Sequence, residues 1–185
     1  MYTTNSTFNS YGTTVFELMS RLAVEHKSIN LGQGFPDDYG PNVVLQKASE
    51  YLFDLPNQYP PMLGVPELRQ AVAAHNKRFY GLDIDWKTET MVSSGATEGL
   101  AACFLGLLNQ GDEVVVIEPL YDCYLPMIER AGGIPKRVSI EPPDWKLNGS
   151  ALRAAFSNKT KLVLINSPQN PSSKVYHREE LLLIA

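Results

Sequence analysis

Clustered basic charge and a cysteine framework are both missing from this sequence of 185 residues. Its 20 acidic and 16 basic residues give a formal net charge of −4 and form no long run of either sign. A nucleic-acid-binding surface requires a clustered basic face, so no nucleic-acid partner is predicted. The two cysteines, Cys103 and Cys123, lie in apolar stretches. They are typical of reduced thiols in a cytoplasmic protein rather than of disulfides.

Long apolar runs are missing as well. The most apolar stretch, residues 99–108, is too short and too interrupted to cross a bilayer, and residues 1–14 lack the features of a secretory signal. We therefore predict no membrane association. What is present is 44% hydrophobic and 19% charged residues, enough apolar surface for a sizeable core. Residues 179–185 look like the opening of a helix without a stop signal, which predicts a truncated sequence.

Helix and strand patterns organise the rest of the chain. Helical periodicity predicts amphipathic helices at 14–27, 41–55 and 65–80. Beyond residue 90, short apolar runs predict strands at 91–92, 114–117, 136–140 and 162–165. Helices are predicted between them, at 97–109, 122–131 and 149–156. Buried strands alternating with helices indicate an α/β fold with a largely parallel sheet, whose functional residues gather where strands end and helices begin.

The first such point is the turn at residues 93–99, Ser-Ser-Gly-Ala-Thr-Glu-Gly. Gly95 allows the backbone to approach a ligand closely, and the amides of a helix start, with the Thr97 hydroxyl, can bind an anion such as phosphate. An ordinary tight turn explains the residues equally well, because such glycine turns are common. The spacing matches neither a Walker loop nor the three-glycine dinucleotide motif.

The second point is the run Glu-Pro-Leu-Tyr-Asp-Cys-Tyr at residues 118–124. Tyr121 follows a buried strand, so its ring is a candidate for stacking on a heteroaromatic cofactor. Packing of Tyr121 and Tyr124 against the sheet edge is the simpler interpretation of this run alone. Asp122 is expected to cap the following helix.

The third point is Asn-Ser-Pro-Gln-Asn-Pro at residues 166–171. Two prolines fix the backbone around a polar dipeptide and direct Asn170 towards the end of the strand. The neutral amide of Asn170 can donate a hydrogen bond to a phenolate oxygen without adding charge. By itself, an Asn-Pro pair usually marks only a turn.

These three motifs, in this order, resemble those of fold-type I pyridoxal-5′-phosphate (PLP) aminotransferases. The resemblance extends from Gly12 to the end of the chain and is strongest to the methionine and kynurenine (glutamine) aminotransferases. Besides the three motifs, it rests on four runs, at residues 12–16, 30–37, 57–62 and 64–65. The implied fold is the type I PLP-transferase fold, with residues 1–45 in the small domain and 46–185 in the first half of the large PLP-binding domain.

The resemblance also implies a role for each motif in holding the cofactor. Gly95, Ala96 and Thr97 would hold the PLP phosphate, with Ala96 and Thr97 offering backbone amides. Tyr121 would stack on the pyridine ring. Asn170 would donate a hydrogen bond to the 3-oxygen of the ring.

Substrate and subunit contacts follow from the same resemblance. Gly34 occupies the position where the family presents a backbone amide to the substrate carboxylate, which Asn170 would also reach. A side chain at Gly34 would block that approach. Tyr59 matches the residue that contacts the phosphate of the neighbouring subunit, which implies a homodimer.

The sequence departs from the family pattern in one place and lacks part of the site. Ser173 stands where many relatives have glycine, so a left-handed backbone is either not needed there or is tolerated by serine with modest strain. The lysine that binds PLP covalently, an aspartate, a tyrosine and an arginine of the family are all expected beyond residue 185. Lys174 lacks the surrounding motif of the missing lysine. No catalytic residue and no metal ligand is therefore predicted in this chain.

The predicted activity is amino-group transfer between an amino acid (methionine, kynurenine, glutamine or an aromatic one) and a 2-oxo acid. PLP acts in this reaction as an electron sink. One alternative is a cysteine-conjugate β-lyase on the same scaffold, which would release pyruvate and ammonia. Another is an inactive chain that lacks the lysine. A nucleotide-binding α/β domain would use the Gly95 turn but would leave Tyr121 and Asn170 unexplained.

Overall fold

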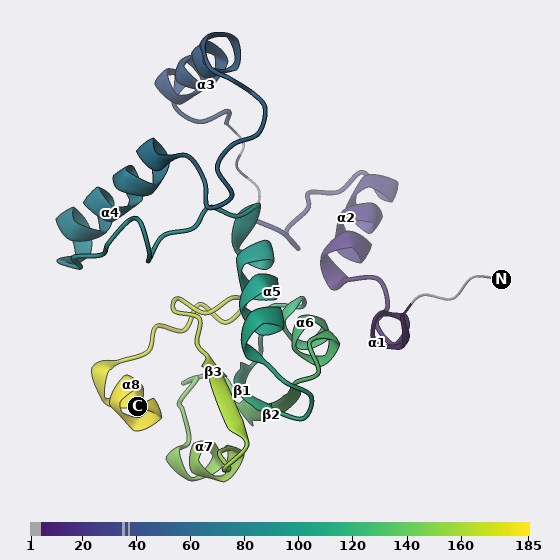
Figure 1. The fold of residues 1–185 in the computed structure, drawn as a ribbon. Coiled ribbons are helices and arrows are strands. Elements are labelled where there is room, and N and C mark those ends of the chain that lie inside the picture. The colour runs from purple at the N-terminus through teal and green to yellow at the C-terminus, as the bar shows by residue number, and fades with distance from the viewer. Residues whose placement is uncertain (1–4, 35, 37) are drawn as a thin grey trace. The chain divides into compact units, whose positions relative to one another are not determined.

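The computed structural model describes residues 5–34, 36 and 38–185, and Phe35 and Asp37 of the run at 30–37 lie outside this part. The chain divides into two units, whose helices and strands are labelled in Figure 1. The first unit comprises Met1–Thr14 and Ala96–Ala185 and is called the sheet unit below; the second, the helical unit, comprises Val15–Gly95. The expected division near residue 45 concerns the small and large domains of the family and stays a prediction.

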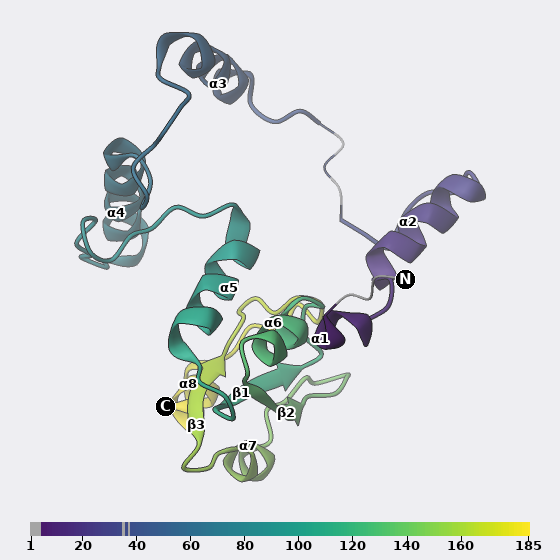
Figure 2. The same cartoon turned by 45° about the vertical axis from the view of Figure 1, so that its right-hand side comes forward.

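A three-stranded parallel sheet forms the centre of the sheet unit (Figure 2). Its strands are β1 (Glu113–Glu118), β2 (Ile134–Ser139) and β3 (Thr160–Leu164), in the order β2-β1-β3. The register pairs Val114 with Pro135 on one side and with Leu162 on the other. The predicted α/β class with a parallel sheet is confirmed.

The apolar side chains of β1 point alternately to the two faces of the sheet and contribute to the hydrophobic core on each face. Val115 and Ile117 belong to a cluster with residues of α7 (Gly149–Ala155). Leu183 and Ile184 of α8 (Arg178–Ile184) pack against this cluster. Val114 and Val116 belong to a second cluster with Phe104 of α5 (Gly95–Leu107) and Ile128 of α6 (Tyr124–Arg130). Side chains on successive strand positions point to opposite faces, so one run of four apolar residues fills both layers.

The N-terminal segment of the chain packs on this unit. Asn5 caps the short helix α1 (Ser6–Asn9) by accepting the N–H of Thr7 at 3.0 Å. The hydroxyl of Tyr11 then donates to Glu129 of α6 at 2.9 Å. Partial burial, followed by the hydrogen bond with Glu129, raises the pKa of Tyr11. Helix α1 was not predicted, because four residues are too few to show a helical period.

Three helices form the helical unit, in agreement with the predicted ones: α2 (Val15–Glu25), α3 (Asn42–Asp54) and α4 (Pro66–Tyr80). Buried Arg69 of α4 donates from Nε to the carbonyl of Thr90 at 2.9 Å and from Nη2 to that of Lys87 at 2.7 Å. Its guanidinium also lies 5.3 Å from the ring centroid of Trp86. These contacts attach the segment before residue 93 to α4.

The strand predicted at Met91–Val92 is not formed. A strand requires a ladder of backbone hydrogen bonds. In the part of the chain that the structure describes, this segment shows a single backbone hydrogen bond, of 3.0 Å, from the N–H of Val92 to the carbonyl of Leu63. The turn at 93–99 therefore follows an irregular segment rather than a strand. Among the described residues, no helix is both long enough and apolar enough to cross a membrane.

Candidate cofactor-binding site

A cavity of about 340 Å³ lies in the sheet unit, beyond the C-terminal ends of β1 and β3 and beside the start of α5. Its lining comes from three separate segments, namely the start of α5, the stretch from Tyr121 to Tyr124 and the loop after β3: Ala96, Thr97, Leu100, Tyr121, Cys123, Tyr124, Asn166, Pro168 and Asn170. The volume lies at the lower end of the range for pockets that bind small molecules. The structure thus brings together four of the predicted cofactor residues, which are up to 74 positions apart in the sequence.

The start of α5 offers a site for an anion. Gly95 has φ of +80°, and the N–H of Gly95 donates to the carbonyl of Ser93 at 2.8 Å. Ala96 and Thr97 follow in the first turn and are exposed. The first N–H groups of a helix have no acceptor within the helix and carry its positive dipole end, so they suit a phosphate group. A Cβ at Gly95 would meet no atom within 4 Å, so the backbone angle, rather than space, favours glycine here.

Tyr121 and Tyr124 form an aromatic pair beside this helix start. Their ring centroids are 5.8 Å apart and the rings are inclined by 61°. Both line the cavity, so the stacking and packing interpretations of Tyr121 are compatible. The expected cap of α6 by Asp122 is wrong, because the residue at the cap position is Cys123 and it makes no side-chain cap bond.

Cys123, in the stretch that follows β1, lies close to the start of α5. Its sulfur is 4.0 Å from the hydroxyl oxygen of Thr97. Burial raises the pKa of the Cys123 thiol and outweighs the opposing effect of Thr97. The thiol is therefore protonated and uncharged at neutral pH. Both cysteines are free, as predicted.

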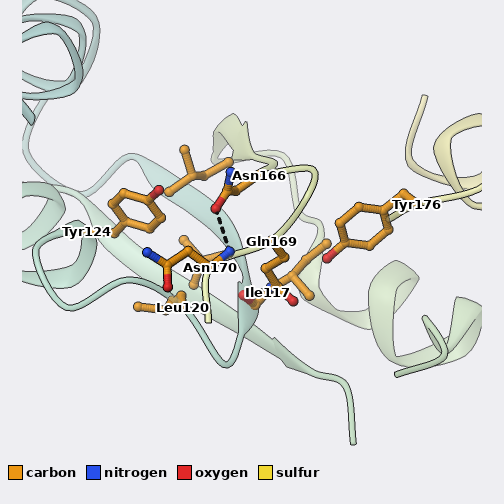
Figure 3. Close-up of a pocket in the computed structure, with 9 residues that line it drawn as sticks. Ile117, Leu120, Tyr124, Asn166, Gln169, Asn170 and Tyr176 are labelled. Atoms are coloured by element: carbon orange, nitrogen blue, oxygen red, sulfur yellow. Dashed lines mark hydrogen bonds between the residues drawn. The ribbon is translucent and has the colours of Figure 1, made fainter. Parts of the chain in front are cut away.

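The loop that follows β3 carries Asn170, whose side chain is exposed and lines the cavity. Its backbone N–H donates to Asn166 Oδ1 at 2.8 Å (Figure 3). Asn166 and Gln169, the buried neighbour of Asn170, belong to the predicted motif, but no role was assigned to either. Ser173 has φ of +60°, so serine does adopt the left-handed backbone that many relatives give to glycine.

Lys174 does not line this cavity. Its ammonium group lies 2.9 Å from the carboxylate of Glu180, and both side chains are largely buried. Burial acts to raise the pKa of Glu180, but hydrogen bonds from Lys174 and from the backbone of His177 and Leu147 outweigh it and lower that pKa. Lys174 therefore attaches α8 to the loop that follows β3, and the expectation that it does not act as the lysine of the family stays a prediction.

The remaining two predicted site residues belong to the helical unit. Gly34 is exposed, and a Cβ there would meet no atom within 4 Å. Tyr59 has a left-handed backbone with φ of +51°, and its side chain is 95% exposed. The fold of this unit gives neither residue a packing role, and their proposed contacts with substrate and partner subunit stay predictions.

The side chains around the cavity fit PLP by their chemistry. Helix N–H groups suit the phosphate, a tyrosine ring suits the flat pyridine, and a neutral amide suits a phenolate oxygen. The nine lining residues include no acidic side chain that would repel the phosphate. Among the described residues, no group of three or more His, Cys, Asp or Glu side chains could hold a metal ion.

Comparisons with known proteins identify the family. The chain is 45% identical over 184 residues to a probable N-succinyldiaminopimelate aminotransferase of Mycobacterium tuberculosis, covering 98% of this chain and 46% of that protein. It is 37% identical to a kynurenine–oxoglutarate transaminase of Dictyostelium discoideum, covering 96% and 44%. A solved Escherichia coli structure with a methionine aminotransferase function has a TM-score of 0.93 and 38% identity, covering 100% of this chain and 48% of that one.

The chain therefore spans about half the length of the relatives it matches. The family model for class I and II aminotransferases matches residues 26–185, which is most of the sequence. This match and the fold of the structural relative agree with the resemblance seen in the motifs. The chain belongs to the class I and II aminotransferase family.

Proposed function

We propose that this chain forms the PLP-binding half of an aminotransferase, with the cofactor in the cavity beside α5. The observation that carries the proposal is the convergence of Ala96, Thr97, Tyr121 and Asn170 on one cavity. They come from the start of α5 and from the loops after β1 and β3, at the edge of the sheet where α/β proteins bind their ligands. Known members of this family use PLP.

The phosphate would lie at the start of α5. There Gly95 turns the backbone, and Ala96 and Thr97 present N–H groups, with the Thr97 hydroxyl as a further donor. The positive end of the helix dipole favours an anion at this position. This arrangement holds a doubly charged group with neutral donors.

The ring would lie between Tyr121 and Asn170. Tyr121 offers an aromatic face and excludes water from one side of the ring. The amide of Asn170 donates to the 3-oxygen and stabilises its ionised form, because a hydrogen bond to the charged form of a group favours that form. When bound, PLP supplies an electron sink for breaking a bond at the α-carbon of an amino acid.

The substrates in this proposal are an amino acid, of the methionine, kynurenine, glutamine or aromatic kind, and a 2-oxo acid. The N–H of Gly34 and the amide of Asn170 would bind the substrate carboxylate. The exposed ring of Tyr59 would contact the cofactor phosphate of a partner subunit in a homodimer. The free cysteines support a cytoplasmic location.

Equilibrium dialysis of the purified chain against PLP tests the cofactor site. Thr97→Val removes a hydroxyl from the phosphate site with little change in volume and should weaken PLP binding about tenfold, as expected for one hydrogen bond to a charged group. Thr160→Val is the matched control, because Thr160 begins β3 and does not line the cavity. Saturable PLP binding that inorganic phosphate displaces supports the proposal. Absence of binding, or equal effects of the two variants, overturns it.

The transfer reaction is tested on a full-length protein that contains this sequence. Methionine and kynurenine are each supplied with PLP and a 2-oxo acid, and the new amino acid is followed by chromatography. Formation of an amino acid from the oxo acid supports a transferase. Release of pyruvate and ammonia from a cysteine conjugate, without transfer, would identify a β-lyase instead.

A further inference from the structure

Gln169 is a buried polar residue that the proposed cofactor contacts do not use. Its side chain is among the few buried polar ones in the described residues, and the residue is 5% exposed. The side-chain Nε2 donates to the backbone carbonyl of Ile117 at 3.1 Å, and Oε1 accepts from the hydroxyl of Ser172. Its backbone N–H donates to the carbonyl of Lys174 at 2.8 Å, and its carbonyl accepts the N–H of Ser173 at 2.7 Å. Gln169 is thus fixed by both its side chain and its backbone.

The bond to Ile117 replaces a missing bond of the sheet. The carbonyls of Asp112 and Glu118 accept from Ile134 and Ile140, on the β2 side of β1. Because backbone groups alternate along a strand, the carbonyl of Ile117 faces the β3 side. The β1–β3 pairing ends at Val116 and Leu164. The Gln169 amide therefore satisfies a buried carbonyl just beyond the point where β3 leaves the sheet.

Gln169 lies next to the proposed cofactor cavity but not in it. It does not line the cavity of about 340 Å³ but lines a neighbouring one of about 10 Å³, which has room for one water molecule at most. Asn166, Asn170 and Tyr124 line both cavities. Figure 3 shows the side chains of Gln169 and Asn170 leaving the loop in opposite directions, one towards β1 and the other towards Tyr124.

We propose that Gln169 is a positioning residue that holds the Asn170 loop in register with the end of β1, and so sets the distance between Asn170 and Tyr121. Ile117 lies four positions before Tyr121, with Pro119 between them. One buried hydrogen bond therefore links the loop that would stack on the cofactor ring with the loop that would bind its 3-oxygen. This inference rests on the proposed function. It concerns the ring contacts and leaves the phosphate site at α5 unaffected.

Three variants of the chain test this inference. Gln169→Leu keeps the size of the side chain and removes the donor to Ile117. Gln169→Glu removes the donor only while the carboxyl is ionised, and the protonated acid regains it. Asn148→Ala is the matched control: Asn148 accepts the N–H groups of Ser150 and Ala151 at the start of α7 and lines neither cavity. The Asn148→Ala variant loses exposed capping hydrogen bonds of α7 without touching the two loops.

Equilibrium dialysis with two probes, PLP and inorganic phosphate, separates positioning from general damage. Gln169→Leu should weaken PLP binding about tenfold and leave phosphate binding unchanged, because affinity falls in proportion to the fraction of chains that hold the two loops in the binding arrangement. Gln169→Glu should show the same defect at neutral pH and approach the affinity of the unmodified chain as the pH falls, whereas Gln169→Leu should not recover. Equal loss of PLP and phosphate binding would indicate general unfolding and overturn the inference.

Hydrogen exchange provides a readout that does not depend on PLP. Gln169→Leu should increase exchange at residues 118–124 and 166–173 together, while Asn148→Ala should change neither. Unchanged exchange in either loop overturns the inference, whether or not PLP binds. If the unmodified chain does not bind PLP, the proposed function fails, and the exchange result alone then decides whether Gln169 couples the loops. Normal PLP affinity in Gln169→Leu overturns the inference and leaves the proposed function standing.

Discussion

Replacing Glu180 by Gln should destabilise the sheet unit, because this carboxylate joins three segments of the chain. It lies 2.9 Å from Lys174 Nζ and accepts the backbone N–H groups of Leu147 and His177 at 3.2 and 3.1 Å. The side chains of Lys174 and Glu180 are only 10% and 15% exposed. The substitution leaves the Lys174 ammonium group without its charged partner in a place largely shielded from water.

The expected loss of stability lies between two limits. Exposed ion pairs contribute about 0–1 kcal/mol, whereas removing one partner of a fully buried pair costs about 3–5 kcal/mol. Both side chains keep a small exposed fraction, and Gln retains an oxygen that can accept an N–H group. We therefore expect a loss of about 2 kcal/mol. For a domain of this size, that lowers Tm by roughly 8 °C.

The loss should also depend on pH. The pKa of Glu180 is lowered in the folded chain, because the hydrogen bonds and charge around it outweigh the effect of burial. A carboxylate with a lowered pKa contributes stability that is fully present above its ordinary pKa and is lost as the pH falls through the lowered value. The difference between the two proteins should be complete at neutral pH and disappear in acid below the lowered pKa.

Denaturant unfolding from neutral pH to acid measures the loss of stability of each variant. Hydrogen exchange of the β1 amides is a second measurement of the same loss. Glu179→Gln is the matched control, since it makes the same charge change on an exposed side chain in the first turn of α8. It removes mainly a favourable interaction with the helix dipole, worth about 0.5 kcal/mol. Equal losses for the two variants, or a loss for Glu180→Gln that is the same at neutral and acidic pH, would refute the reasoning.

Three further predictions concern the cofactor site and its loop. Tyr121→Ala should weaken PLP binding about 5–30-fold, or about 1–2 kcal/mol, and Tyr121→Phe should not; equilibrium dialysis measures both, and normal affinity of the Ala variant contradicts stacking. Ser173→Gly should stabilise the chain by up to about 1 kcal/mol in denaturant unfolding, because glycine adopts the φ of +60° without strain; destabilisation would contradict this. A polypeptide of these 185 residues with PLP, methionine and a 2-oxo acid should form no more product by chromatography than free PLP does, because Lys174 is paired with Glu180 and the residues that line the cavity include no lysine. Turnover well above free PLP would contradict that expectation.

The pattern of apolar residues predicted most of the elements. The three strands β1, β2 and β3 and the helices α2 to α7 begin and end within two residues of the expected positions. Their residues show a clear period over one to four turns or a continuous apolar run, and each pattern is local in the sequence. The order of the motifs also indicated which loops would meet, because parallel strands present their C-terminal ends at one edge of the sheet.

The errors arose where a local pattern had more than one solution. Met91 and Val92 are apolar enough for a strand, but a strand exists only where another strand pairs with it. In the described chain this segment makes one backbone bond, from the N–H of Val92 to the carbonyl of Leu63. Asp122 is a good capping residue by type, yet α6 begins one position later, and Cys123 occupies the cap position. In both cases the decisive partner or boundary was set by neighbouring elements.

The sequence by itself determined the α/β pattern, the family resemblance and the identity of the residues at the candidate site, because these depend on residue type and short-range spacing. Only the tertiary structure decided how the site is supported. Gln169 donates to a carbonyl 52 positions away, and Lys174 pairs with a carboxylate that also accepts the N–H of Leu147. Such bonds form where the end of one strand meets the loop of another, and their partners are specified by the packing of the sheet rather than by any local sequence pattern.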